Sequence, residues 1–177
     1  MSPRQDELSA AGWAVLGVVA EGPTHGFAVA QIMGKDGPVG RVWTLPRPLV
    51  YRELNRLLSL DLVAELENQR SEHGPMRTIL AARPQGRRAV SHWLRQPVDH
   101  VRDVRSSLLL KLVLLERSGE DPRMLLEAQR QRLQPQVAGL QELRDRAEGF
   151  DRVLAQWRLV SSQATVQFVD SMLDNLS

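Results

Sequence analysis

A short segment near the middle of the chain, LPRPLVYRELNRLLSLDLV at residues 45–63, combines a leucine stripe with polar side chains that bind anions and planar polar rings. Its apolar residues at positions 50, 54, 57 and 58 have helical spacing and predict one buried face. The opposite face carries guanidinium, phenol and amide groups, which hydrogen-bond to phosphates and to the edges of nucleobases. These groups belong to Arg47, Tyr51, Arg52, Asn55 and Arg56.

A second basic group follows this segment. LVAELENQR and MRTILAAR show partial alternation of apolar and polar residues, and SEHGP between them contains a Gly-Pro turn. Residues 62–83 are therefore predicted to form a β-hairpin. Arg70, His73 and Arg77 lie at or beside its turn, where their side chains could contact phosphates.

Helices are predicted on both sides of the hairpin. The first begins after Ser9, a good N-cap, and ends before Gly22; HGFAVAQIM forms the second, and residues 47–60 the third. QGRRAVSHWLR follows the hairpin as a fourth helix, which Pro97 ends. Three helices and then a two-stranded hairpin with a basic tip is the order of a winged helix-turn-helix. Residues 1–97 are therefore predicted to form a DNA-binding domain, with the third helix in the major groove.

The distribution of charge supports an anionic partner for this region. Arginine supplies 21 of the 23 basic residues, and the net charge of the whole chain is only +2. Between positions 41 and 95, however, ten arginines face five acidic residues, a local balance of +5, so the rest of the chain sums to −3. Each arginine taken singly could equally be a solvated side chain or a partner in a surface salt bridge.

Residues 98–177 are predicted to form a helical dimerisation domain, which makes the fold class mainly α (α+β). Two long helices carry apolar stripes that are too long and too thinly covered to be buried inside one small chain. Packing of these helices within a monomer is the alternative. The residues expected at the dimer interface are Leu126, Leu133, Leu140, Trp157, Val160, Ala164 and Phe168.

The sequence gives little support for catalysis or metal binding. Cysteine is absent, and there is no phosphate-binding glycine loop, no G-x-S-x-G elbow and no H-E-x-x-H motif. His25 has no second metal ligand three or four residues away, so we expect it to tie its turn by a hydrogen bond. No enzyme, metal or cofactor is predicted. The longest apolar run, residues 10–20, is too short to cross a bilayer, and a cytoplasmic location is expected.

Several motifs together resemble the PadR family of transcriptional regulators. LGVVAEGPTHGFAVAQIM is similar to the Gly-Pro-x-His-Gly turn and second helix of that family, and VYRELNRLLSLDLV to its recognition helix with Tyr-x-x-Leu-x-x-Leu. EHGPMRTILAARPQGRRAVSHWL resembles the wing and fourth helix, and VRSSLLLKLVLLERSG the start of the C-terminal domain of the longer members. The chain departs from the family at Leu80 and Arg83, where Tyr and Thr are usual, and at its Arg-Pro-Leu start of the recognition helix.

The resemblance implies a homodimeric regulator, most simply a repressor, that binds a pseudo-palindromic operator of double-stranded DNA. Its two recognition helices would enter major grooves about 34–36 Å apart. Some members respond to small aromatic ligands, and Trp93 and Trp157 are the candidates to stack such a compound, although a tryptophan on an apolar stripe is more often core. The alternative function is a winged-helix adaptor that binds protein through its C-terminal helices.

Overall fold

The computed structural model describes residues 8–69 and 77–176, with the backbone alone for residues 67–69. The chain divides into two compact units, each of which combines segments distant in sequence. Among the described residues, the first unit contains residues 8–94 and 109–120, and the second contains residues 95–108 and 121–176. None of the helices in these ranges is both long and apolar enough to cross a membrane.

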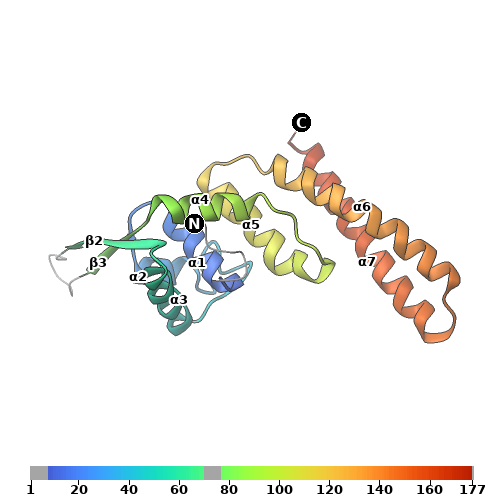
Figure 1. Ribbon diagram of the computed structural model, residues 1–177, viewed down its shortest axis with the longest axis horizontal. Coiled ribbons are helices and arrows are strands. Elements are labelled where there is room, and N and C mark those ends of the chain that lie inside the picture. Colours follow the sequence, from blue (N-terminus) through green and yellow to red (C-terminus); the bar gives the residue numbers. More distant parts are fainter. Residues whose placement is uncertain (1–7, 70–76, 177) are drawn as a thin grey trace. The chain divides into compact units, whose positions relative to one another are not determined.

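The first unit has the predicted order of a winged helix-turn-helix (Figure 1). Three helices precede a β-hairpin, a fourth helix follows it, and a fifth joins the unit from further along the chain. In chain order these elements are α1 (Ala10–Ala20), β1 (Thr24–His25), α2 (Gly26–Ile32), α3 (Arg47–Ser59), β2 (Val63–Gln69), β3 (Arg77–Ala82), α4 (Pro84–Leu94) and α5 (Leu109–Ser118).

Helix α1 forms the centre of the first unit. The side-chain oxygen of Ser9 accepts a hydrogen bond from the N–H of Gly12 at 3.0 Å, so the predicted N-cap is confirmed. Every residue from Ala11 to Val19 is buried, because α2, α3, α4, α5 and β3 all contact this helix. A helix that is apolar on all sides belongs inside a core.

The sheet has three strands in the order β1-β3-β2, one more than the predicted wing. The hairpin of β2 and β3 is confirmed, with Val63 opposite Ala82 at its base. The additional strand β1 is only two residues long, and its His25 pairs with Ile79 of β3 in antiparallel register. This pairing brings the turn before α2 beside the wing, which the local sequence pattern could not reveal.

Helix α5 packs in the first unit, although the sequence assigned its residues to the domain of 98–177. Two contacts with α1 explain its position. Nε and Nη2 of Arg117 donate to the two carboxylate oxygens of Glu21, at 2.7 and 2.6 Å. Leu114 packs so tightly on Gly17 that a Cβ added to the glycine would lie 2.7 Å from its Cδ1.

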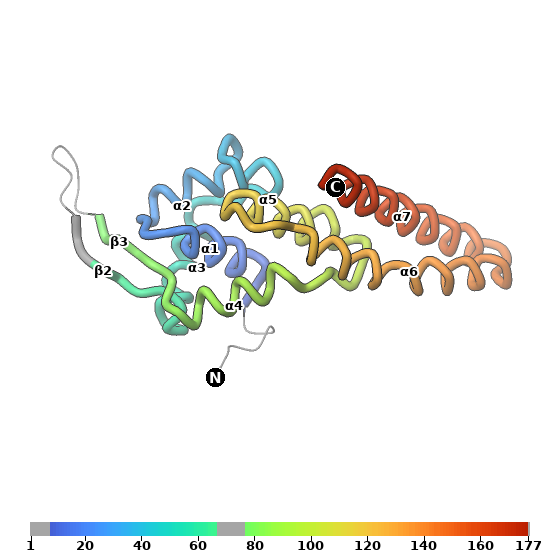
Figure 2. Tube along the Cα trace, turned by 90° about the horizontal axis from the view of Figure 1, so that it is seen from above, coloured from blue at the N-terminus to red at the C-terminus, as the bar shows by residue number. Residues whose placement is uncertain are grey.

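The second unit is dominated by two long helices, α6 (Arg123–Arg146) and α7 (Gly149–Asp174), which form an antiparallel hairpin (Figure 2). A short 3-10 turn, η2 (Val101–Asp103), and a π-helical turn, η3 (Val104–Leu108), belong to the same unit. The buried face of α7 consists of Ala155, Leu159, Ser162, Thr165 and Val169.

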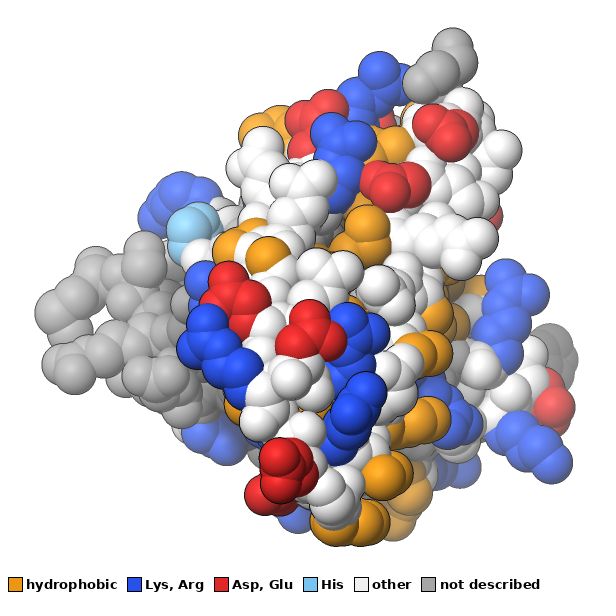
Figure 3. All heavy atoms as spheres, turned by 90° about the vertical axis from the view of Figure 1, so that its right-hand side faces the viewer, with side chains coloured by type: hydrophobic (Ala, Val, Ile, Leu, Met, Phe, Trp, Pro, Cys, Tyr) orange, Lys and Arg blue, Asp and Glu red, His pale blue; other side chains and the backbone are white. Residues whose placement is uncertain are grey.

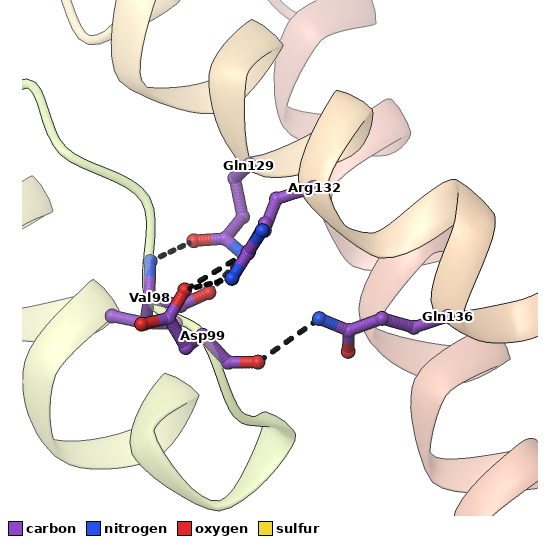
Figure 4. Close-up of polar contacts among 5 residues, drawn as sticks. All are labelled: Val98, Asp99, Gln129, Arg132 and Gln136. Carbon is purple, nitrogen blue, oxygen red and sulfur yellow. Dashed lines mark hydrogen bonds and ion pairs between the residues drawn. The ribbon is translucent and has the colours of Figure 1, made fainter.

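Polar contacts hold the segment before η2 against α6 (Figure 4). Gln129 is fully buried, and its amide group bonds the backbone of Val98 twice: it accepts from the N–H at 2.7 Å and donates to the carbonyl at 3.0 Å. Arg132 pairs with the carboxylate of Asp99 at 2.7 Å, and Gln136 donates to the Asp99 carbonyl at 3.0 Å. A buried glutamine is tolerated here because both ends of its amide group are bonded.

Candidate nucleic-acid interface

Helix α3 has the two faces that its sequence predicts. Val50, Leu54 and Leu57 are buried against the first unit. The five predicted contact residues of this helix, Arg47, Tyr51, Arg52, Asn55 and Arg56, are all exposed. A helix with an anchored apolar face and an exposed polar face of this kind can enter the major groove of a duplex.

One acidic residue of α3 lies on the buried side, which the sequence did not reveal. Glu53 is only 2% exposed, and its Oε1 lies 3.4 Å from Nη2 of Arg52. Its Oε2 has no hydrogen-bond partner among the described residues and faces Gly12, in the first turn of α1. The positive end of the α1 dipole offsets part of the cost of burying this carboxylate. One guanidinium nitrogen of Arg52 therefore balances part of the negative charge of Glu53, and the remaining N–H donors stay at the surface.

An open hollow of about 540 Å³ lies between α2, α3 and the strands, and we call it the basic hollow. Leu54, Leu58 and Leu80 form its apolar lining. Its polar and aromatic lining combines residues from the turn before α2, from α3 and from β3. These residues, together with Phe27 of α2 and Glu65 of β2, are His25, Arg47, Tyr51, Asn55, Arg77 and Thr78.

The two most distinctive sequence motifs meet in this hollow. Tyr51 of the Tyr-x-x-Leu motif packs on Gly26 of the Gly-Pro-x-His-Gly turn, where a Cβ would lie 2.7 Å from the tyrosine Cε1. Glycine is required for this close approach, since any side chain would displace the ring. The contact holds the phenol at the edge of α3, where it remains 41% exposed.

Three further contacts involve the side chains that line the basic hollow. The guanidinium of Arg47 lies over the ring of Phe27, 4.6 Å from its centroid, a favourable cation–π arrangement. Nδ1 of His25 accepts a hydrogen bond from the N–H of Ala28 at 3.1 Å, so the structural role predicted for this histidine is confirmed. Nη1 of Arg77 lies 3.4 Å from the other ring nitrogen, Nε2.

The predicted wing residues are only partly described. Arg77 is exposed at the start of β3, on the rim of the basic hollow. Arg70 and His73 lie outside the described residues. Of the DNA contacts inferred from the sequence, the structure describes the five residues of α3 and Arg77, with His25 and Phe27 beside them in the basic hollow. The His-Gly-Phe sequence contains both residues, but only the pairing of β1 with β3 shows that they lie next to the wing.

The two tryptophans predicted to bind a ligand have different surroundings. Trp93 is buried in the first unit, where it stacks on Trp13 at 5.4 Å between centroids and lies 4.7 Å from the Lys111 ammonium. It thus contributes to the core, as a tryptophan on an apolar stripe usually does. Trp157 is 68% exposed and borders a second hollow of about 580 Å³ in the second unit. Arginines at positions 102, 105 and 158 line the same hollow.

The predicted dimer interface separates into a buried and an exposed part. Leu126 and Leu133 of α6 are fully buried within the chain, and Leu140 is half-buried. The residues of α7 lie on its outer side: Trp157, Val160 and Ala164 are exposed and Phe168 is half-buried. Figure 3 looks onto the connected end of the α6–α7 hairpin, where hydrophobic side chains are visible among charged ones.

Comparison with known proteins gives matches among solved structures alone. No protein-family model matches the chain, and no curated protein matches it. The structure of Bacillus subtilis PadR in complex with operator DNA matches with a TM-score of 0.47 and 17% identity, over 92% of this chain and 97% of that one. PadR in complex with p-coumaric acid gives 0.41 and 18%, over 93% of both chains. The protein smu.1604c from Streptococcus mutans gives 0.44 and 15%, over 92% of this chain and 98% of that one. The chain is thus similar, over most of its length, to solved structures of PadR, the name borne by the family that its sequence motifs resemble.

Proposed function

We propose that this chain is a sequence-specific DNA-binding transcriptional regulator of the PadR type that acts as a homodimer. The observation that carries the proposal is the exposed polar face of α3, anchored by its buried leucines and flanked by the basic hollow. Arg52, Asn55 and Arg56 would read base edges in the major groove, since guanidinium and amide groups pair with guanine and adenine there. Arg47, Tyr51 and Arg77 would contact the backbone and set the register.

Homodimerisation is proposed through the outer side of α7. Phe150, Val153, Trp157 and Val160 are all exposed and follow one another at steps of three, four and three residues. This spacing produces a continuous apolar seam along one side of a helix, which a second copy can cover. The two DNA-binding units of the dimer, each with its α3 helix, would then bind the two halves of a pseudo-palindromic operator.

Repression is the simplest output of such a dimer, because a protein bound across a promoter occupies the DNA that polymerase needs. A small aromatic anion could relieve it by binding at the second hollow, where Trp157 offers a ring for stacking and Arg102, Arg105 and Arg158 offer positive charge. Such a ligand would change the operator affinity only if it bound one arrangement of the dimer more tightly than the other.

The test of DNA binding is a titration of the duplex upstream of the protein's own gene, compared with an unrelated duplex of equal length. We expect the specific duplex to be retained at lower protein concentration, with a logarithmic salt slope of about −0.9 for each phosphate neutralised. Arg52→Ala and Arg56→Ala should each lower the specific affinity about tenfold. Arg152→Ala, an exposed arginine of α7, is the matched control and should change little.

Binding that is absent, or equal for both duplexes and insensitive to Arg52 and Arg56, would contradict the proposal. A protein partner bound through the C-terminal helices, with no dependence on salt, would favour the adaptor function instead.

A further inference from the structure

Two hydrogen-bond donors of the basic hollow face each other at short range. Nδ1 of His25 accepts the hydrogen bond from Ala28, so this nitrogen carries no proton. The ring proton must then be on Nε2, which makes Nε2 a donor. Nε2 lies 3.4 Å from Nη1 of Arg77, and a guanidinium nitrogen can only donate. The two groups cannot satisfy one another.

An anionic oxygen would resolve this arrangement. Neighbouring N–H groups of this kind can donate to one phosphate group, whose oxygens each accept more than one hydrogen bond. The guanidinium of Arg47 lines the same hollow and is held in place by Phe27. Glu65 is the acidic residue of the lining, and no ion pair joins it to Arg47 or Arg77 in the described part of the chain. The lining therefore keeps an excess of positive charge.

We propose that His25, Arg77 and Arg47 form a phosphate-binding subsite, which takes one phosphodiester group of the DNA backbone. The subsite rests on the proposed function for the source of its phosphate. It gives His25 a second role, because one ring nitrogen caps α2 and the other donates to the ligand. The β1–β3 pairing positions the subsite: His25 lies opposite Ile79, two residues from Arg77 on the same strand. The wing and the turn before α2 would thus grip the same phosphate.

The variant His25→Asn separates the two roles of the histidine. Asparagine is a good N-cap, so its side-chain oxygen can still accept from the N–H of Ala28. Its side chain is too short to place a donor where Nε2 lies, so the contact with phosphate is lost. Arg77→Gln removes the positive charge of the second donor, the guanidinium of Arg77. Thermal unfolding of both variants, measured beside the wild type, shows whether the fold is retained.

The first measurement is the affinity of the upstream duplex for wild type, His25→Asn, Arg77→Gln and the double variant. We expect each single variant to lose about tenfold, because a hydrogen bond to a charged group is removed. Since both residues would hold the same phosphate, the double variant should lose little more DNA affinity than the single variant with the larger loss. If the wild type binds with its expected salt slope but the single losses are absent, or simply multiply in the double variant, the subsite is wrong while the proposed function stands.

The second measurement does not need DNA. Inorganic phosphate is titrated into the full-length 15N-labelled protein while the histidine ring resonances are recorded, with the His25 signals assigned by their loss in His25→Asn. We expect the Nε2 resonance of His25 to shift, and the shift to disappear in Arg77→Gln. A shift in a protein that binds no DNA would assign the subsite to free phosphate and overturn its assignment to the DNA backbone. No shift, together with no coupling on DNA, overturns the subsite altogether.

Discussion

Gly26 is the residue at which the Gly-Pro-x-His-Gly and Tyr-x-x-Leu motifs are in contact. Adding a single methyl group there tests whether this contact matters for DNA binding. Gly26→Ala should push Tyr51 from its position, since the new Cβ would lie 2.7 Å from the tyrosine Cε1. Gly26 is the first residue of α2 and does not have a left-handed φ, so alanine adds no backbone strain there and the fold should be retained. We therefore expect DNA affinity to fall severalfold while the melting temperature does not.

Duplex titration and thermal unfolding of the same preparation check this expectation. Gly22→Ala is the matched control, because a Cβ at Gly22 would meet nothing within 4 Å. An unchanged affinity in Gly26→Ala would show that the position of Tyr51 is not important for binding.

At the scale of elements, α5 depends on contacts with α1 for its place in the first unit. The hydrogen bond to Glu21 raises the pKa of Arg117 above its ordinary value. A raised pKa of a basic group contributes stability that is fully present below the ordinary pKa and is lost as the pH rises from there through the raised value. The arginine side of this pair therefore contributes equally across the neutral and mildly alkaline range.

The variant Glu21→Gln should lower the free energy of unfolding by about 1 kcal/mol, because a two-pronged ion pair of partly buried groups becomes a neutral hydrogen bond. Urea unfolding at neutral pH measures the change. Glu116→Gln removes the same charge from an exposed position on α5 and should have little effect. If Glu21→Gln is as stable as wild type, the pair does not hold α5 in place.

At the scale of the whole molecule, the outer side of α7 predicts assembly. Phe150 is 76% exposed and begins a seam that continues through Val153, Trp157 and Val160. Soluble monomers rarely display a row of large apolar side chains of this length. Covering the seam with a second copy would remove it from water and present two α3 helices on one particle.

We expect the wild type to be a dimer by light scattering and the double variant Val153→Lys/Val160→Lys to be a monomer, since two buried charges on each chain would oppose association. Gln156→Lys/Gln163→Lys adds the same charges at the same spacing on the flank of α7 and should remain dimeric. The monomeric variant should also lose most of its operator affinity. A monomeric wild type, or a dimer unaffected by the seam variants, would place the interface elsewhere.

The parts of this protein that could be predicted from sequence are those set by local patterns. The cap at Ser9, the two-faced helix α3 and the β2–β3 hairpin depend on residues within a few positions of one another, so periodicity and turn residues suffice. The exposed arginines of α3 follow from its buried leucines, because one helical face determines the other.

Contacts between distant segments were decided only by the tertiary structure. The strand β1 exists through its pairing with β3, more than fifty residues away, and this pairing brings His25 to Arg77. Apolar periodicity shows that a helix has a face to bury but does not identify its partner. Hence α1 is buried on all sides, α5 joins the first unit, and Leu126 and Leu133 are covered within the chain while the stripe of α7 stays exposed.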